Sequence, residues 1–227
     1  MLSVRRLLER FRSGGGDLVG GGERVDIDAR RSTPFEKFDL YQKSHFRRYE
    51  FACAELGAGR RCADLACGSG YGSVMLAERF ERVVGVDLDA AVVHEIRERY
   101  RQIPNVEFRN ANLLDLAFDS ELDAIVSFET VEHLPEPAIP RVFEIFQRGL
   151  TPGGRLVFSV PFLQPEPTAD QDPGFHLTFE IDEKKVEHWL AVAGLTLEGY
   201  RYQSYATHAI ESSLADKDFL ICLARKS

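Results

Sequence analysis

Short apolar runs alternate with longer amphipathic segments through most of the chain, and this alternation limits the fold more than any other feature. Runs rich in Val, Ile, Leu and Phe predict buried strands, and the segments between them carry helical spacing. The pattern predicts an α/β fold: a doubly wound, mostly parallel seven-stranded sheet with the last strand antiparallel. The expected strands are 61–66, 83–87, 106–109, 123–128, 155–162, 195–203 and 219–226, and the expected helices are 35–57, 72–80, 89–101, 138–149 and 182–193.

The beginning of the chain differs in composition from the rest. Residues 2–12 have the spacing of a short amphipathic helix, and the stretch 13–23 is rich in glycine, whose backbone entropy opposes ordering. We therefore predict an N-terminal appendage with a Gly-rich linker over 1–32 and one domain over 33–227. The short helix fits a packing or dimer arm better than a membrane-surface helix, so a homodimer stays open as an alternative to a monomer.

Charge and cysteine content exclude several classes of partner. The net charge of -8 and the pI near 5.3 disfavour broad binding to nucleic acid or anionic lipid. No apolar run approaches the roughly 20 residues that span a bilayer, and the first residues lack a signal-peptide core. The four cysteines have neither CxxC spacing nor a partnered histidine pair, so neither a disulfide framework nor a metal site is predicted. We expect a cytoplasmic protein without nucleic-acid partners or a membrane span.

A glycine turn between the first expected strand and its helix predicts a ligand site. Gly68 and Gly70 allow a tight turn and close approach of a ligand to the main chain. Asp87 ends the next strand, 19 residues after Gly68 (87 − 68), where a carboxylate can accept both hydroxyls of a ribose. Asp64, just before the turn, would repel a pyrophosphate but can accept from an ammonium group, directly or through water. The GxGxG spacing also departs from the dinucleotide pattern GxGxxG. The residues therefore favour a nucleoside ligand without phosphate.

These residues resemble the class I S-adenosylmethionine-dependent methyltransferases over roughly 40–226, which implies a Rossmann-like fold. The resemblance implies that Asp64 and the 68–72 turn hold the methionine part of the cofactor and that Asp87 holds the ribose. Asn112 stands where many members carry Asp, and Ala66 where many carry Gly, a change that costs little if φ is negative. The residues expected to bind the cofactor are Asp64, Ala66, Gly68, Gly70, Asp87, Leu88, Asn112, Leu113 and Phe128.

The acceptor side is predicted from two segments. Residues 127–134 (SFETVEHL) resemble the segment that lies under the sulfonium in this family, which makes Glu129 and His133 candidate pocket residues. His176 lies in the proline-rich segment 161–180, an expected lid, and is a candidate general base, with His133 orienting the pocket. A local hydrogen-bonding role is the alternative for His176. Arg48 fits a solvated helix charge better than a partner for the methionine carboxylate.

We therefore predict an enzyme that transfers a methyl group from S-adenosylmethionine to a small-molecule acceptor. The likeness to bacterial members from sugar, lipopolysaccharide and other glycan pathways points to a hydroxyl of a sugar or glycan intermediate, and a quinone or lipid-like acceptor is the next choice. An NAD-dependent oxidoreductase and a SAM-binding protein without catalysis are the alternative functions.

Overall fold

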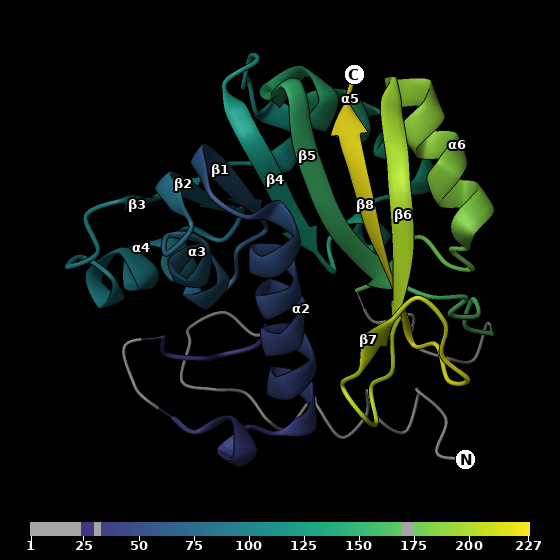
Figure 1. The fold of residues 1–227 in the computed structure, drawn as a ribbon, viewed down its shortest axis with the longest axis horizontal. Coiled ribbons are helices and arrows are strands. Elements are labelled where there is room, and N and C mark those ends of the chain that lie inside the picture. The colour runs from purple at the N-terminus through teal and green to yellow at the C-terminus, as the bar shows by residue number, and fades with distance from the viewer. Residues whose placement is uncertain (1–23, 30–32, 169–174) are drawn as a thin grey trace.

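An eight-stranded sheet forms the centre of the computed structural model, which describes residues 24–29, 33–168 and 175–227 (Figure 1). The strand order is β3-β2-β1-β4-β5-β8-β6-β7. The strands are β1 (Gly59–Leu65), β2 (Phe80–Asp87), β3 (Val106–Asn110), β4 (Leu122–Phe128), β5 (Leu150–Pro161), β6 (Leu195–Gln203), β7 (Ile210–Glu211) and β8 (Phe219–Lys226).

The pairing of the strands confirms the predicted topology. β1 to β5 pair in parallel, and β8 inserts between β5 and β6 and is antiparallel to both. Figure 1 shows β8 running in the opposite direction to β5. The additional strand is the two-residue β7, which pairs with the end of β6. It was not predicted because two residues are too short to show a period.

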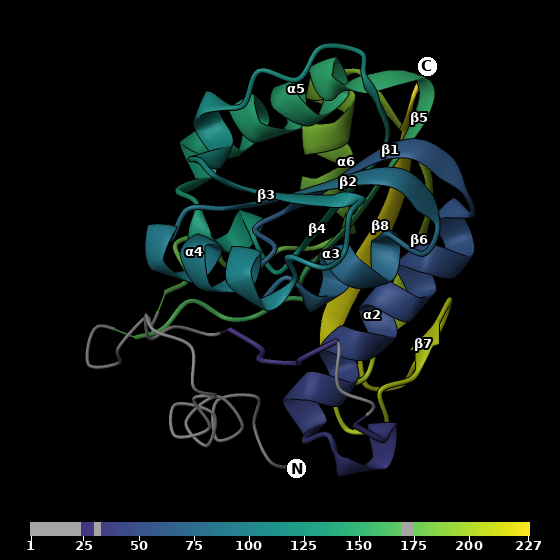
Figure 2. The same ribbon diagram turned by 90° about the vertical axis from the view of Figure 1, so that its left-hand side faces the viewer.

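Helices cover both faces of the sheet, as a doubly wound fold requires. Figure 2 shows α2, α3 and α4 on one face and α5 and α6 on the other. The helices are α2 (Leu40–Leu56), α3 (Tyr71–Leu76), α4 (Ala90–Arg99), α5 (Ile139–Gly149) and α6 (Glu183–Ala193). None of these described helices is long and apolar enough to cross a membrane.

The predicted start of the first helix at residue 35 is wrong, because a capping box begins α2 at Leu40. The Asp39 carboxylate accepts from the Gln42 backbone N–H at 2.8 Å, and the Gln42 side chain accepts from the Asp39 N–H at 3.1 Å. This reciprocal pair fixes the first turn of the helix. The residues before it form only a short 3-10 turn, η1 (Phe35–Lys37).

The hydrophobic core lies in two layers, one on each side of the sheet. Successive strand residues alternate between them: Ile125 packs in the cluster with α5 and α6, and Val126 packs in the cluster with α2 and α3. The four cysteines are free and buried, as expected for reduced thiols. Because the five parallel strands are covered on both faces, their open carboxyl ends are the natural place for a ligand.

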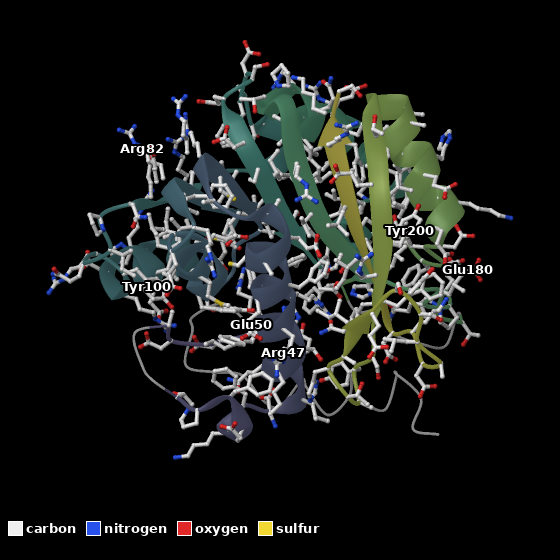
Figure 3. All side chains as sticks on the ribbon, viewed as in Figure 1. Arg47, Glu50, Arg82, Tyr100, Glu180 and Tyr200 are labelled. Atoms are coloured by element: carbon white, nitrogen blue, oxygen red, sulfur yellow. The ribbon has the colours of Figure 1, made fainter. Side chains whose placement is uncertain are left out.

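Residues 24–29, which the sequence analysis assigned to the appendage, pack against the domain. Val25 and Ile27 are buried in the layer with α2. The Tyr100 hydroxyl, labelled in Figure 3, donates to the Ile27 carbonyl at 3.2 Å and accepts from the Ala29 N–H at 3.3 Å. The rest of the predicted appendage, including the helix expected over 2–12, lies outside the described residues.

Candidate functional site

A cavity of about 620 Å³ opens at the carboxyl ends of the parallel strands. Its lining comes from the segments that follow β1, β2, β3, β4 and β5, and from the inner side of α2. This volume is typical of a site for a small molecule or cofactor. The position agrees with the predicted one. Of the predicted site residues, Ala66, Gly68, Asp87, Leu88, Asn112, Leu113, Phe128, Glu129, His133 and His176 line the cavity.

The glycine turn is formed by left-handed backbone. Gly68 lines the cavity with a φ of 51°. Gly70 precedes α3 with a φ of 75°, and a Cβ there would lie 2.9 Å from the Phe108 ring. Gly70 does not line the cavity. A glycine is required at this position by the turn and by the packing of the Phe108 ring. Ala66 has a φ of 62°, so the condition under which this alanine would cost little is not met, and it carries strain that a glycine would relieve.

Asp64 lies beneath the cavity and is fully buried. Its carboxylate accepts from the Tyr49 hydroxyl at 2.9 Å and from the Ser73 hydroxyl at 2.6 Å. Burial raises the pKa of Asp64 to about 6, although both hydrogen bonds favour the ionised form. The structure therefore does not place Asp64 in the lining. Tyr49, which was not predicted as a site residue, lies between this carboxylate and the cavity.

Asp87 connects the end of β2 to the glycine turn. Its two carboxylate oxygens accept from the Gly68 N–H at 2.9 Å and from the Asp89 N–H at 3.0 Å. Asp89, not Asp87, caps α4 by accepting from the first backbone N–H groups of that helix. The Arg24 guanidinium lies 3.6 Å from Asp87 and 3.2 Å from Asp89 and also lines the cavity. Asp87 therefore faces the cavity at the position expected for a ribose ligand.

The end of the cavity beyond Asp87 presents an apolar surface beside an amide. Leu88 is 70% exposed and lines the cavity. Asn112 and Leu113 follow β3 at the same end. The Asn112 side-chain oxygen accepts from the Leu114 N–H at 2.9 Å and has a second lone pair for an adenine amino group. These side chains can bind a flat base.

Glu129 is held at the centre of the site by a buried arginine. One carboxylate oxygen accepts from the Ser159 hydroxyl at 2.6 Å and lies 3.3 Å from the Arg48 guanidinium. Arg48 is fully buried, donates to the Gln203 side-chain oxygen at 2.6 Å and lies over the Phe219 ring. The prediction of a solvated Arg48 is wrong, because α2 packs this side chain against the sheet. A carboxylate paired in this way is a positioning group rather than an available base.

The two predicted histidines meet on the β4–β5 side of the cavity, whereas Leu88 follows β2. The rings of His133 and His176 lie 5.0 Å apart, centre to centre. His133 follows β4 in the short turn η3 (Val131–His133), and His176 lies between β5 and α6. Phe128, at the end of β4, lines the cavity and packs edge-on against Tyr49. His133 and His176 thus define an imidazole-lined end of the cavity, and Leu88 and Asn112 line its β2–β3 side.

The comparisons with known proteins agree with this geometry. Residues 62–154 match the family described as a methyltransferase domain. The chain is 36% identical over 160 residues to a probable S-adenosylmethionine-dependent methyltransferase of Mycolicibacterium smegmatis. The aligned region covers 67% of this chain and 60% of that protein. It is also 30% identical over 106 residues to a ubiquinone biosynthesis O-methyltransferase of Acinetobacter baylyi. This aligned region covers 45% of this chain and 44% of that protein.

Solved structures share the fold at low sequence identity. An S-adenosylmethionine-dependent methyltransferase from Clostridium acetobutylicum matches with a TM-score of 0.65 and 15% identity, over 85% of this chain and 94% of that one. The [4+2]-cyclase SpnF matches with a TM-score of 0.66 and 19% identity, over 98% of this chain and 93% of that one. The fold alone therefore does not determine the reaction.

Fold and site together define a Rossmann-like domain with a cavity at the carboxyl ends of its parallel strands. Residues 62–154 form a methyltransferase domain, whose similarity to S-adenosylmethionine-dependent methyltransferases indicates S-adenosylmethionine as the cofactor. The chain spans 60% of the length of the first curated relative named above and 44% of the second.

Proposed function

We propose that the protein transfers the methyl group of S-adenosylmethionine to a hydroxyl of a small-molecule acceptor. The observation that carries the proposal is one continuous cavity with Asp87 and Leu88 at one end and His133 and His176 at the other. In the reaction the sulfur–methyl bond breaks and sulfur keeps its electron pair. The acceptor oxygen forms the new bond to carbon and loses its proton.

Alignment supplies most of the catalysis in such a displacement, because the sulfonium already activates the methyl group. Asp87 accepts from the ribose hydroxyls, and Leu88 packs on the adenine. Asp64 acts through Tyr49. The Tyr49 hydroxyl donates its proton to the Asp64 carboxylate, and its oxygen can accept a hydrogen bond from the ammonium group of S-adenosylmethionine. Glu129 is held by Arg48, so the two histidines are the groups that act on the acceptor hydroxyl.

The class of acceptor is proposed from the imidazole-lined end of the cavity. Leu163 and Phe175 line it and are 52% and 56% exposed. Large apolar side chains at a pocket mouth favour an acceptor with an apolar portion. This supports a quinone or lipid-like acceptor over the sugar or glycan hydroxyl that the sequence predicts. The similarity to a ubiquinone biosynthesis O-methyltransferase supports the same choice.

The cellular setting is part of the proposal. The buried free thiols fit a reducing compartment such as the cytoplasm. The net charge of -8 disfavours a nucleic-acid acceptor. A homodimer formed through the N-terminal segment stays a prediction, which size-exclusion chromatography with light scattering tests directly.

A thermal-shift experiment tests the cofactor. S-adenosylhomocysteine at 100 times its Kd should stabilise the fold by about 2.7 kcal/mol and raise Tm by roughly 5–10 °C, whereas NAD should not. The Asp87→Ala variant should lose most of this shift. A larger shift with NAD would support the oxidoreductase alternative.

A turnover experiment tests the reaction. The protein is incubated with labelled S-adenosylmethionine and either hydroxylated quinone precursors or sugar acceptors, and the products are analysed by mass spectrometry. Methylation of a hydroxylated aromatic acceptor is expected. Cofactor binding without methylation of either class would favour the SAM-binding protein without catalysis.

A further inference from the structure

Three side chains that can bind metal meet at the imidazole-lined end of the cavity. Glu132 and His133 lie in η3, and His176 comes from the segment between β5 and α6. One ligand atom from each of the three lies within 4.8 Å of the other two. The sequence predicted no metal site, because this group forms only when two distant segments come together.

Backbone hydrogen bonds hold these two segments in place. The Glu132 carbonyl accepts from the N–H groups of Leu177 and Thr178, at 2.8 Å and 3.0 Å. The Thr178 hydroxyl also donates to the Leu134 carbonyl at 2.7 Å. These bonds lie beside His133 and His176 in the sequence, so they hold the backbones of the two histidines close together.

Each imidazole is also oriented by a hydrogen bond from its Nδ1 atom. His133 Nδ1 lies 3.0 Å from the Phe175 carbonyl oxygen, and His176 Nδ1 lies 2.7 Å from the Gln164 side-chain oxygen. Both partners are acceptors, so each Nδ1 is the donor, and a ring in this tautomer has its lone pair on Nε2. This arrangement is typical of metal-binding histidines, whose second nitrogen donates to a carbonyl or carboxylate.

The distances fit a cation after a small movement of the side chains. The Nε2 atom of His133 lies 3.9 Å from a carboxylate oxygen of Glu132. Around a tetrahedral ion with bonds of about 2.1 Å, ligand atoms are about 3.4 Å apart. The Glu132–His133 pair must therefore close by about 0.5 Å, and a pair at the 4.8 Å limit by about 1.4 Å. Glu132 is 1% exposed, so a cation bound to its carboxylate would be largely shielded from water.

We propose that Glu132, His133 and His176 bind a divalent transition-metal cation whose open coordination position faces the cavity. Two nitrogen ligands and one carboxylate favour a zinc-like or iron-like ion over Mg²⁺ or Ca²⁺, which prefer oxygen. The open position faces the cavity because the two histidines line the cavity, whereas Glu132 is buried and does not line it.

The open position would bind the oxygen of the acceptor hydroxyl, and this part of the proposal rests on the proposed methyl transfer. A cation polarises such a hydroxyl, so its proton can pass to water at neutral pH. The two histidines then act as ligands rather than as a general base. The metal site itself does not depend on which reaction the protein catalyses.

Cobalt titration of the chelator-treated full chain tests the site without an activity assay. Co²⁺ should bind with one-to-one stoichiometry and give visible d–d absorption bands, and Zn²⁺ should displace it. His133→Ala, His176→Ala and Glu132→Gln should each weaken Co²⁺ binding by about 100-fold or more, and Gln164→Ala by about 10-fold. His188→Ala, which removes an exposed imidazole on α6, is the matched control and should bind Co²⁺ like the unchanged protein.

The S-adenosylhomocysteine thermal shift, measured on every variant, shows that the fold and cofactor pocket persist. Absence of a saturable Co²⁺ spectrum in the unchanged protein would overturn the proposal. So would a His176→Ala variant that keeps its cofactor shift and binds Co²⁺ normally. Loss of the cofactor shift in the unchanged protein would instead contradict the proposed function and leave the Co²⁺ result standing.

Discussion

The buried carboxylate of Asp64 should give the stability of the protein a specific pH dependence. Burial raises its pKa from the ordinary 3.8 to about 6. The folded state therefore prefers the protonated form. The stability that Asp64 contributes is fully present below pH 3.8 and is lost as the pH rises through about 6. The pKa difference corresponds to roughly 3 kcal/mol in total, of which about half falls between pH 5 and pH 7.5.

The perturbation that isolates this effect is Asp64→Asn. The amide cannot ionise, so the free energy of unfolding of the unchanged protein should fall by about 1.5 kcal/mol relative to the variant between pH 5 and pH 7.5. Asparagine accepts with only one atom, so the Tyr49 or Ser73 hydroxyl loses its acceptor. That loss lowers the free energy of unfolding of the variant by the same amount at every pH, so the difference in pH dependence between the two proteins remains.

Urea unfolding at several pH values, followed by circular dichroism, measures the slopes. Asp119→Asn changes an exposed carboxylate by the same atoms and serves as the control. Tyr49→Phe should move the Asp64 midpoint to higher pH, because the tyrosine hydrogen bond stabilises the ionised carboxylate. Parallel stability curves for the unchanged protein and Asp64→Asn would refute the reasoning.

Three further substitutions test the cofactor end of the site. Asp87→Asn should weaken S-adenosylhomocysteine binding about 10- to 100-fold in calorimetry, because charge-assisted bonds to the ribose are lost; an unchanged Kd would show a purely structural role. Ala66→Gly should raise the free energy of unfolding by about 0.5–1 kcal/mol in urea, since its φ is 62°, and a loss of stability would contradict the strain. Leu88→Ala should weaken cofactor binding several-fold with little change in Tm, whereas Val192→Ala, at a comparably exposed position on α6, should change neither; equal effects would argue against adenine packing on Leu88.

The parts of the fold that the sequence predicted are those with a local signal. Buried parallel strands are continuous apolar runs, and all seven longer strands were found from them. The start of α2 was misplaced because the aromatic residues before Asp39 continue the helical spacing while the capping box ends it. Only the folded chain shows β7, whose two residues pair with the end of β6.

The site residues likewise separate into those that a local sequence signal predicts and those that it does not. Asp87 was predicted because it ends a strand, where a parallel sheet places its ligand, whereas Leu88 and Asn112 were predicted from the family resemblance; all three line the cavity. Arg24 was missed because the glycines before it suggested a linker. The signal that could have revealed it is the alternation of apolar and acidic residues from Val25 to Asp28, which is typical of a segment with one buried face.

The centre of the site depends on contacts that no local pattern contains. Arg48 is buried because Gln203 and Phe219, more than 150 residues later, accept its hydrogen bond and cover its face. The buried Arg48 in turn pairs with the Glu129 carboxylate, and the Glu129 backbone has a φ of 49°. Ala66, Glu129 and Leu163 are three of the six described non-glycine residues with positive φ, and all three line the cavity. Strain of this kind persists only where the surrounding contacts outweigh it, so the buried arginine and the strained turns are parts of one arrangement that shapes the cavity.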